Sequence, residues 1–335
     1  MKRDGYLYLA MLAAFLALVV IVLGAYVRLS QAGLGCPDWP GCYGHISVPD
    51  THQAIAAADA SFTGRPLQTE RAWKEMIHRY FAGSLAVLVL ILAVIAWWRR
   101  RHAAQPVLLP SLALLVVIFQ ALLGMWTVTL LLFPPVVMGH LLGGYATFAI
   151  LILLVLQTGG YLRNGDVASN MLRWLTAVAL LVLVFQIALG GWTSSNYAGI
   201  ACPDFPTCQG QWWPPMDFRD AFSWHGLGPD YQGGILGEPA RAAIHMTHRL
   251  GALVTVITVL ATALLCLFKG RNSGIKWLGA LAGALVICQM GIGIGMVHLA
   301  LPLALTVAHT GAAAVLLATI ACLNWAVWAR PESLL

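Results

Sequence analysis

The sequence has little charge. Only 10% of its 335 residues are Asp, Glu, Lys or Arg, whereas a soluble domain carries roughly 25%. Hydrophobic residues make up 60% of the chain. A chain so poor in charged side chains is not an ordinary soluble domain, and its composition predicts an all-α polytopic membrane protein.

Acidic residues are scarcer than basic ones, 13 against 19, which gives a net charge of +6. The basic residues are scattered among short loops. This distribution fits the excess of Lys and Arg found in cytoplasmic loops better than it fits a nucleic-acid-binding surface. We therefore expect membrane lipid, and no nucleic acid, around the chain.

The sequence also lacks the marks of a removed targeting segment. Residues 6–27 are uncharged, exceed the core of a signal peptide in length, and show no small-residue cleavage pattern. No arginine-rich amphipathic presequence precedes them. We expect a retained first helix and a location in the bacterial cytoplasmic (inner) membrane.

Eight apolar stretches are each long enough to cross a hydrocarbon core of roughly 30 Å, which takes about 20 helical residues. The third and fourth stretches are continuous, as are the seventh and eighth. We divide them at Pro134-Pro135 and at Pro302, because proline marks helix boundaries. The eight predicted spans are residues 6–27, 75–98, 107–131, 136–161, 174–193, 242–268, 277–298 and 303–329.

The basic loop residues fall on one side of these spans. That side is cytoplasmic by the positive-inside rule and includes both the N- and the C-terminus. The outward side holds two long loops, residues 28–74 and 194–241, which contain Trp, Pro and Cys. The basic residues assigned to the cytoplasmic side are Lys2, Arg3, Arg99, Arg100, Arg101, Arg163, Arg173, Lys269, Arg271, Lys276 and Arg330.

The two halves of the chain repeat the same landmarks. Residues 33–42 match residues 199–208 at an offset of 166, and the histidine motifs repeat at offsets of 169 and 170. Accidental matches are common in apolar helices, but several polar landmarks in the same order are not. The sequence predicts two pseudo-symmetric four-helix bundles, residues 1–165 and 166–335. The repeated residues are Cys36 and Cys202, Cys42 and Cys208, His78-Arg79 and His248-Arg249, Gln120 and Gln289, and His140 and His309.

Four of the repeated residues are histidines near the outward ends of their spans. An ionisable side chain inside a membrane span is costly and suggests a functional site, and imidazoles from facing helices are common axial ligands of haem iron. We predict that His78 and His140 bind one iron, and that His248 and His309 bind a second. The alternative for any one of them is a core histidine hydrogen-bonded to a backbone carbonyl.

Charged residues accompany two of these histidines. Arg79 and Arg249 directly follow ligand candidates, and could pair with haem propionates or extend to lipid head groups. Glu75 lies one turn before His78 on the same helix face, where the second half has His245. We predict that Glu75 is catalytic, in proton transfer or charge stabilisation; the alternative is a carboxylate favoured by the helix dipole.

The seven cysteines fall into two groups. Three lie in apolar spans, where they act as small hydrophobes. The other four form two pairs in the outward loops, and an oxidising compartment favours the disulfides Cys36–Cys42 and Cys202–Cys208. Zinc binding together with the loop histidines His45 and His52 is the alternative, although the spacing matches no standard zinc pattern.

Together these residues resemble the haem A synthase family, membrane enzymes that make haem A for cytochrome oxidases. The resemblance covers nearly the whole chain. Its motifs are Glu75-x-x-His78-Arg79, Gly139-His140, His248-Arg249, Ala308-His309 and the two Cys-x5-Cys loops. The family has eight membrane helices in two halves, in agreement with the architecture predicted from the spans and the repeat.

The resemblance also implies an activity. The first half would hold the substrate, haem O, between His78 and His140, and the second half a haem b cofactor between His248 and His309. A ring methyl group of haem O would be oxidised to a formyl group by successive hydroxylations and loss of water. Glu75 matches the essential glutamate of the family, and both haem sites would lie toward the extracytoplasmic side.

Two other functions stay open. A di-haem electron carrier would do no chemistry on its haem, but such carriers commonly place two irons at different depths, whereas all four ligand candidates lie at the outward end. A haem-delivery or oxidase assembly factor would need no catalytic residue, and Glu75 counts against it. A complex with the haem-farnesylating enzyme or with oxidase assembly factors, or an oligomer, is compatible with the sequence.

Overall fold

The computed structural model describes residues 3–102, 105–162, 169–270 and 272–328, and within them it contains helices and no strand. Eight helices are long and apolar enough to cross a membrane, which confirms the predicted all-α membrane fold. The elements are α1 (Arg3–Leu29), α2 (His52–Ser61), α3 (Thr69–Trp98), α4 (Leu108–Thr129), α5 (Pro134–Gly159), α6 (Asn170–Ser195), the 3₁₀-helix η1 (Ala198–Ile200), α7 (Phe218–Ala221), α8 (Glu238–Lys269), α9 (Ser273–His298) and α10 (Leu303–Trp328).

Both divisions of the continuous apolar runs at proline are confirmed. α5 begins at Pro134, in the first turn, where a missing N–H leaves no helical hydrogen bond unmade. α10 begins directly after Pro302. The boundary predicted between the halves, at residues 165 and 166, lies outside the described residues, as do Lys2, Arg163, Arg271, residue 329 and Arg330.

Four predicted helix starts are late by four residues or more, since α6 and α9, like α3 and α8, begin before the predicted spans. α3 begins at Thr69 rather than at residue 75, and α8 begins at Glu238 rather than at residue 242. Charged side chains are excluded from the hydrocarbon, but a helix continues through them into water because its backbone bonds are internal. The uncharged stretches of the sequence therefore predict the bounds of the membrane spans, but not the bounds of the helices.

The first outward loop contains a helix that the sequence analysis did not predict. α2 begins at His52, which was predicted to be a loop residue. Thr51 caps this helix, since its hydroxyl accepts a hydrogen bond of 3.2 Å from the N–H of Ala54. Of the histidines outside the ligand set, His52 is the one that the structure moves from a loop into a helix.

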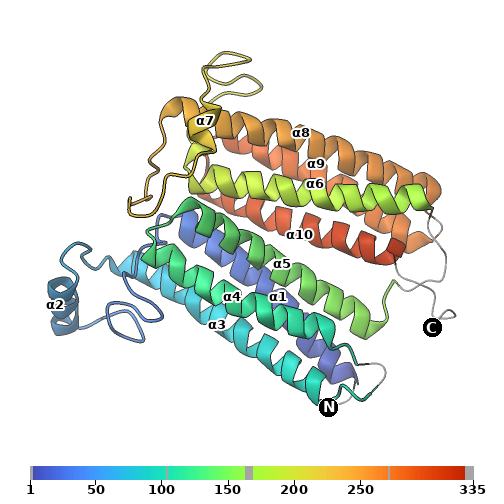
Figure 1. Ribbon diagram of the computed structural model, residues 1–335, viewed down its shortest axis with the longest axis horizontal. Coiled ribbons are helices and arrows are strands. Elements are labelled where there is room, and N and C mark those ends of the chain that lie inside the picture. The colour runs from blue at the N-terminus through green and yellow to red at the C-terminus, as the bar shows by residue number, and fades with distance from the viewer. Residues whose placement is uncertain (1–2, 103–104, 163–168, 271, 329–335) are drawn as a thin grey trace.

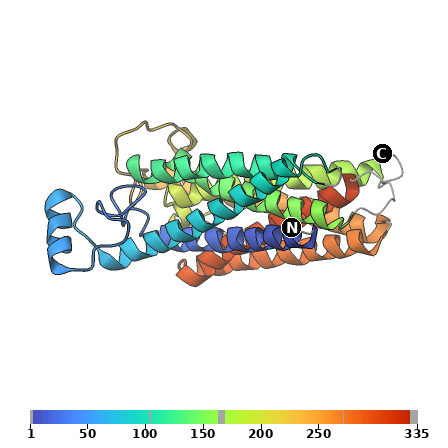
Figure 2. The same ribbon diagram turned by 90° about the horizontal axis from the view of Figure 1, so that it is seen from below.

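The eight spanning helices form two rings of four. In one ring, α1 and α4 each pack on both α3 and α5; in the other, α6 and α9 each pack on both α8 and α10. The rings meet where α5 packs on α6 and α10 and where α1 packs on α10 (Figure 1; Figure 2). α3 and α5, like α8 and α10, are thus diagonal partners across the interior of a ring.

Small side chains let α1 lie against three other helices. Ala10, Ala13, Ala14 and Ala17 are buried and share one helix face. Small residues permit the close backbone approach by which helices associate in lipid, where no hydrophobic effect drives them together. The hydroxyl of Tyr145 on α5 donates a hydrogen bond of 2.7 Å to the carbonyl of Thr310 on α10, which adds a polar contact between the rings.

The two long loops lie together at one end of the helices, and α2 projects beyond that end in both views (Figure 1; Figure 2). The second loop belongs to the second half of the sequence but reaches the first ring. The N–H of Tyr231 donates to the carbonyl of Leu131 at 3.1 Å, and its ring lies 5.5 Å from the ring of Phe133. Asp230 forms an exposed ion pair of 3.4 Å with Arg65 of the first loop. The second loop therefore covers the end of the first ring that carries the first long loop.

Tyr231 is predicted to hold this loop in place. Its side chain is 2% exposed, and replacing a buried aromatic residue by Ala typically costs about 3 kcal/mol. Tyr231→Ala should make local opening of the loop easier by that order, so that a protease cleaves within residues 212–236 at least tenfold faster. Trp212→Ala is the control, because Trp212 is 73% exposed in the same loop. Equal cleavage rates for the two variants would contradict the contact.

Candidate functional site

The four predicted ligand histidines lie on diagonal helices. His78 is on α3 and His140 on α5, across the first ring; His248 is on α8 and His309 on α10, across the second. The imidazoles of His78 and His140 are close enough to interact electrostatically, and so are those of His248 and His309. The structure therefore brings the histidines together in the two predicted pairs.

A glycine of a neighbouring helix faces each imidazole. A Cβ atom added to Gly24 would lie 2.9 Å from Cε1 of His78, and one added to Gly190 would lie 3.2 Å from Cε1 of His248. The same holds for Gly124 opposite His140, at 3.4 Å, and for Gly293 opposite His309, at 3.3 Å. These distances are shorter than or at the lower limit of ordinary Cβ contacts, so glycine lets each ring lie directly against the next helix.

Two of the four rings lack the partner that a core histidine would have. Nδ1 of His78 and Nδ1 of His309 are buried without a hydrogen bond among the described residues, although buried polar atoms are normally paired. The alternative of an ordinary core histidine bonded to a backbone carbonyl therefore does not describe them. Each of these two imidazoles can therefore take a partner that the described residues do not supply.

Gln186 on α6 contacts the third ligand candidate, and the sequence analysis missed it. Its Nε2 lies 3.0 Å from Nδ1 of His248 and donates a hydrogen bond of 3.0 Å to the carbonyl of the same residue. Such contacts fix the orientation of a ligating imidazole. Gln289, part of the repeat, donates in the same way to the carbonyl of His309 at 3.0 Å.

The two cysteine loops have the same internal structure. Both predicted disulfides are present, with S–S distances of 1.99 Å for Cys36–Cys42 and 1.98 Å for Cys202–Cys208. Sulfur atoms joined in this way cannot be thiolate ligands, which removes the zinc alternative. In each loop an aspartate accepts two backbone N–H groups, those of residues 43 and 44 for Asp38 and those of residues 209 and 210 for Asp204.

Hydrogen bonds to the carboxylate of Asp204 lower its pKa, because they favour the charged form. The Thr207 hydroxyl and the backbone N–H groups of Gly210 and Gln209 lower the pKa of this carboxyl below its usual value. The charged form is the one that holds the loop. The second loop is therefore organised around an anionic capping residue at neutral pH.

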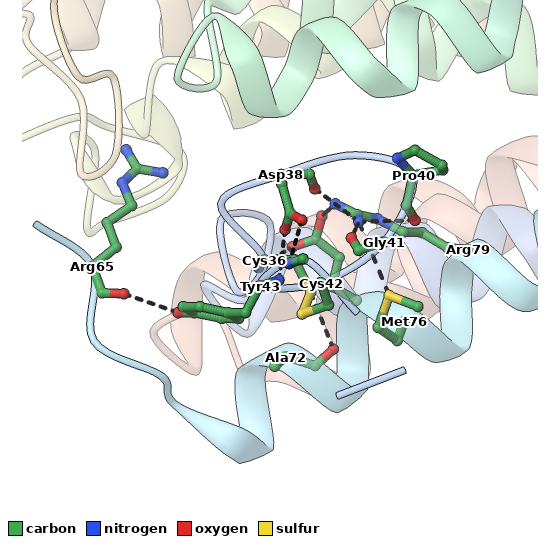
Figure 3. The surroundings of a disulfide bond; sticks show 12 residues. Cys36, Asp38, Pro40, Gly41, Cys42, Tyr43, Arg65, Ala72, Met76 and Arg79 are labelled. Atoms are coloured by element: carbon green, nitrogen blue, oxygen red, sulfur yellow. Dashed lines mark hydrogen bonds and ion pairs between the residues drawn. A yellow bond between two sulfur atoms is a disulfide. The ribbon is translucent and has the colours of Figure 1, made fainter. Parts of the chain in front are cut away.

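Arg79 and Arg249 are bound to these loops. The guanidinium of Arg79 donates to the carbonyls of Asp38, at 3.0 Å, and of Gly41 (Figure 3). The guanidinium of Arg249 donates to the carbonyls at the matching positions, Asp204 at 2.9 Å and Thr207 at 2.8 Å. Each arginine thus connects a cysteine loop to the helix that carries one of the ligand candidates, His78 or His248. The predicted pairing of these two arginines with propionates stays a prediction, and the structure gives both of them another partner.

Glu75 distinguishes the first site from the second. Its side chain is buried, 5% exposed, and its Oε1 lies 2.5 Å from Nη2 of Arg79. Its Oε2 accepts the N–H of Cys36 at 3.3 Å. Because α3 begins at Thr69, Glu75 lies well beyond the first turn, and the alternative of a carboxylate held by the helix dipole does not apply. In the second half, the matching position is occupied by His245, which is also buried. The second site therefore has no carboxylate at this position.

Known proteins match almost the full length of the chain. A family described as cytochrome oxidase assembly protein matches residues 7–321. A protein named Heme A synthase from Shewanella oneidensis is 44% identical over 318 residues, which cover 94% of either chain. The chain belongs to the haem A synthase family.

More distant relatives bear the same name. Heme A synthase of Halalkalibacterium halodurans is 27% identical over 287 residues, covering 83% of this chain and 82% of the relative. That of Caulobacter vibrioides is 25% identical over 351 residues, covering 97% and 96%. As a member of the haem A synthase family, the chain is an integral membrane enzyme of haem A synthesis.

The glycines opposite the imidazoles should be needed for haem binding. Gly190→Ala places a methyl group against His248, and displacing the ring should weaken haem binding in the second ring about tenfold, as loss of groups that orient metal ligands does. Gly291→Ala on α9 is the control, since a Cβ there meets nothing within 4 Å. The haem-to-protein ratio after purification, read from the absorption spectrum, distinguishes them. Normal haem content in Gly190→Ala would contradict the close approach.

Proposed function

We propose that the chain converts haem O to haem A for cytochrome oxidase assembly. Two successive hydroxylations of one ring methyl group, each a two-electron oxidation that requires an external oxidant, would give a hydrated aldehyde, which loses water to leave the formyl group. The observation that carries this proposal is the pairing of His78 with His140 across the first ring, with Glu75 one turn away. The relatives named Heme A synthase support it.

The residues present fit a haem in each ring. Diagonal helices supply two imidazoles, glycines let the rings lie against the neighbouring helices, and the Nδ1 atoms of His78 and His309 have no hydrogen-bond partner among the described residues. We propose that His78 and His140 hold the iron of haem O, and that His248 and His309 hold haem b. When bound, haem b supplies a redox-active iron for electron transfer to the first site.

The proposed division of labour follows the two halves of the chain, residues 1–165 and 166–335. The two rings repeat the same neighbours, glycines, arginine contacts and disulfides, which supports one site in each half. We also propose that the cysteine loops and haem sites face the extracytoplasmic side, with both termini in the cytoplasm. The described basic residues at the other end of the helices support that orientation; they include Arg99, Arg100, Arg101, Arg173, Lys269 and Lys276.

Glu75 is the proposed catalytic residue of the first site. It shares a helix face with His78, and its carboxylate is shielded from water. Its Oε1 is bound closely by Arg79, whereas its Oε2 makes a longer contact with the N–H of Cys36. Oε2 is therefore the atom at which the chain can take up or deliver a proton. The contact with Cys36 also links this atom to the Cys36–Cys42 disulfide.

An electron carrier without chemistry on its haem is less well supported. All four imidazoles lie near the loop-bearing ends of their helices, in the second to fourth turn of each. Two irons held at the same end do not form a path across the membrane. The buried carboxylate in one ring alone has no role in such a carrier.

Removal of the Glu75 carboxylate should block the reaction without removing the haem. Glu75→Gln should retain haem but slow haem A formation by about a hundredfold, a usual loss for a general acid or base. Haem extracted from cells that supply haem O, separated and weighed by mass spectrometry, should then contain haem O or the hydroxylated intermediate.

Glu70→Gln is the control for this experiment, because Glu70 lies on the same helix with an exposed side chain that pairs with Lys74. Alkylation of free thiols should show that Cys36 and Cys42 stay oxidised in Glu75→Gln, which separates a chemical defect from a disrupted loop. Unchanged haem A yield in Glu75→Gln would remove Glu75 from the mechanism.

A further inference from the structure

Two arginines outside the predicted sites occupy matching positions on α3 and α8. Arg71 precedes His78 by seven residues, and Arg241 precedes His248 by seven. Seven residues make almost two helical turns, so each arginine lies on nearly the same helix face as the histidine and about 10 Å farther outward. The offset between Arg71 and Arg241 is the 170 that separates His78 from His248.

Arg71 lines a polar cavity of about 220 Å³ at the outer end of the first ring. Among the described residues, its guanidinium has no hydrogen bond or ion pair, whereas Arg65 on the same cavity is paired with Asp230. Leu34 also lines the cavity and packs against Leu132 and Phe133 in the turn between α4 and α5. The cavity therefore lies over the ring that contains His78 and His140.

Arg241 is incompletely paired in the second ring. Its Nε is buried and has no hydrogen-bond partner among the described residues. Leaving a buried donor of a charged group unpaired is unfavourable by more than a typical hydrogen bond contributes. A donor retained in this state needs an acceptor that the protein itself does not provide.

The neighbouring arginines are engaged by the protein through their terminal nitrogens, although the Nε atoms of Arg28 and Arg249 are also buried without a hydrogen-bond partner among the described residues. Arg79 and Arg249 are bound to carbonyls of the cysteine loops, and Arg28 donates to the hydroxyl of Tyr197 and the carbonyl of Ser194. The guanidiniums of Arg71 and Arg241 differ from these, because neither forms a hydrogen bond or an ion pair among the described residues, so both faces of the fork stay available to an anion. A guanidinium binds a carboxylate through two parallel hydrogen bonds.

We propose that Arg71 and Arg241 bind the propionate carboxylates of the haems in the first and second rings. This inference rests on the proposed function, because it requires a haem on each histidine pair. The propionates leave one edge of the tetrapyrrole, and the cost of a charge in hydrocarbon directs that edge outward. With the iron level with the histidines, the carboxylates extend toward the turn that carries each arginine.

Esterified haem provides the test. Purified apoprotein is titrated with haem B and with its dimethyl ester, which has the same ring and iron but no carboxylate. Arg241→Ala should raise the dissociation constant for haem B about tenfold, as expected for loss of a charged hydrogen-bonded pair. The constant for the ester should be unchanged. Arg241→Lys should recover part of the loss, and Arg219→Ala, at an exposed position on the same side, should have no effect.

The outcomes separate the two proposals. If the wild-type protein binds no haem B, the proposed function fails. If the wild-type protein binds haem B, two results for Arg241→Ala count against the proposal: the variant weakens the binding of haem B and of the ester equally, or it weakens the binding of neither. Either result would show that the propionate assignment is wrong. If Arg241 instead binds a lipid phosphate, Arg241→Ala would change the dissociation constants of haem B and of the ester equally. The stability of the wild-type protein would then differ between nanodiscs of anionic lipid and nanodiscs of neutral lipid.

Arg71 is tested with the substrate. Arg71→Ala should raise KM for haem O about tenfold and leave kcat nearly unchanged, because the contact is the same in the ground and transition states. Binding of haem O by an inactive Glu75→Gln protein, followed by absorption, should weaken by the same factor when Arg71→Ala is added. A fall in kcat with unchanged binding would overturn the role proposed for Arg71.

Discussion

The cost of placing imidazoles inside membrane helices governs this structure. Each proposed ligand histidine lies within an apolar bundle, where an unpaired polar side chain is unfavourable. The chain gives two of them no partner of their own at Nδ1 and places a glycine beside every ring. A buried imidazole in such surroundings is stabilised when it binds a partner. In the proposed function, this partner is a haem iron held between diagonal helices. The ring of four helices places the two histidines of each pair on diagonal helices.

The cysteine loops connect this interior to the outer surface. Arg79 and Arg249 directly follow the proposed ligands His78 and His248 in sequence, and their guanidiniums donate hydrogen bonds to carbonyls of the two disulfide loops. A change in loop structure would therefore act on a helix turn that carries a ligand. In the first half alone, Glu75 adds a buried carboxylate between the loop and the histidine. This asymmetry within a repeat is the physical basis for assigning chemistry to one half and a cofactor to the other.

Much of this arrangement could be predicted from the sequence. The eight spans follow from hydropathy, the histidine pairs and disulfides follow from polar landmarks that repeat, and Pro134 and Pro302 divide the continuous runs. Arg71 and Arg241 repeat as regularly as the histidines, but the predicted spans began after them, because absence of charge does not mark where a helix starts. Gly24 and Gly190 also repeat, yet their role depends on which helix lies opposite. The crossing of the second loop to the first ring, through Tyr231, depends on tertiary contacts that no sequence pattern indicated.

The most direct test of the central claim is the haem content of single-ligand variants. His78→Ala and His309→Ala would be purified from cells that supply haem B alone and from cells that also supply haem O, and each haem quantified by extraction. Two independent sites predict that His309→Ala loses haem B but still binds haem O, and that His78→Ala loses haem O but keeps haem B. Loss of both haems from either folded variant, or of neither, would contradict one haem site in each ring.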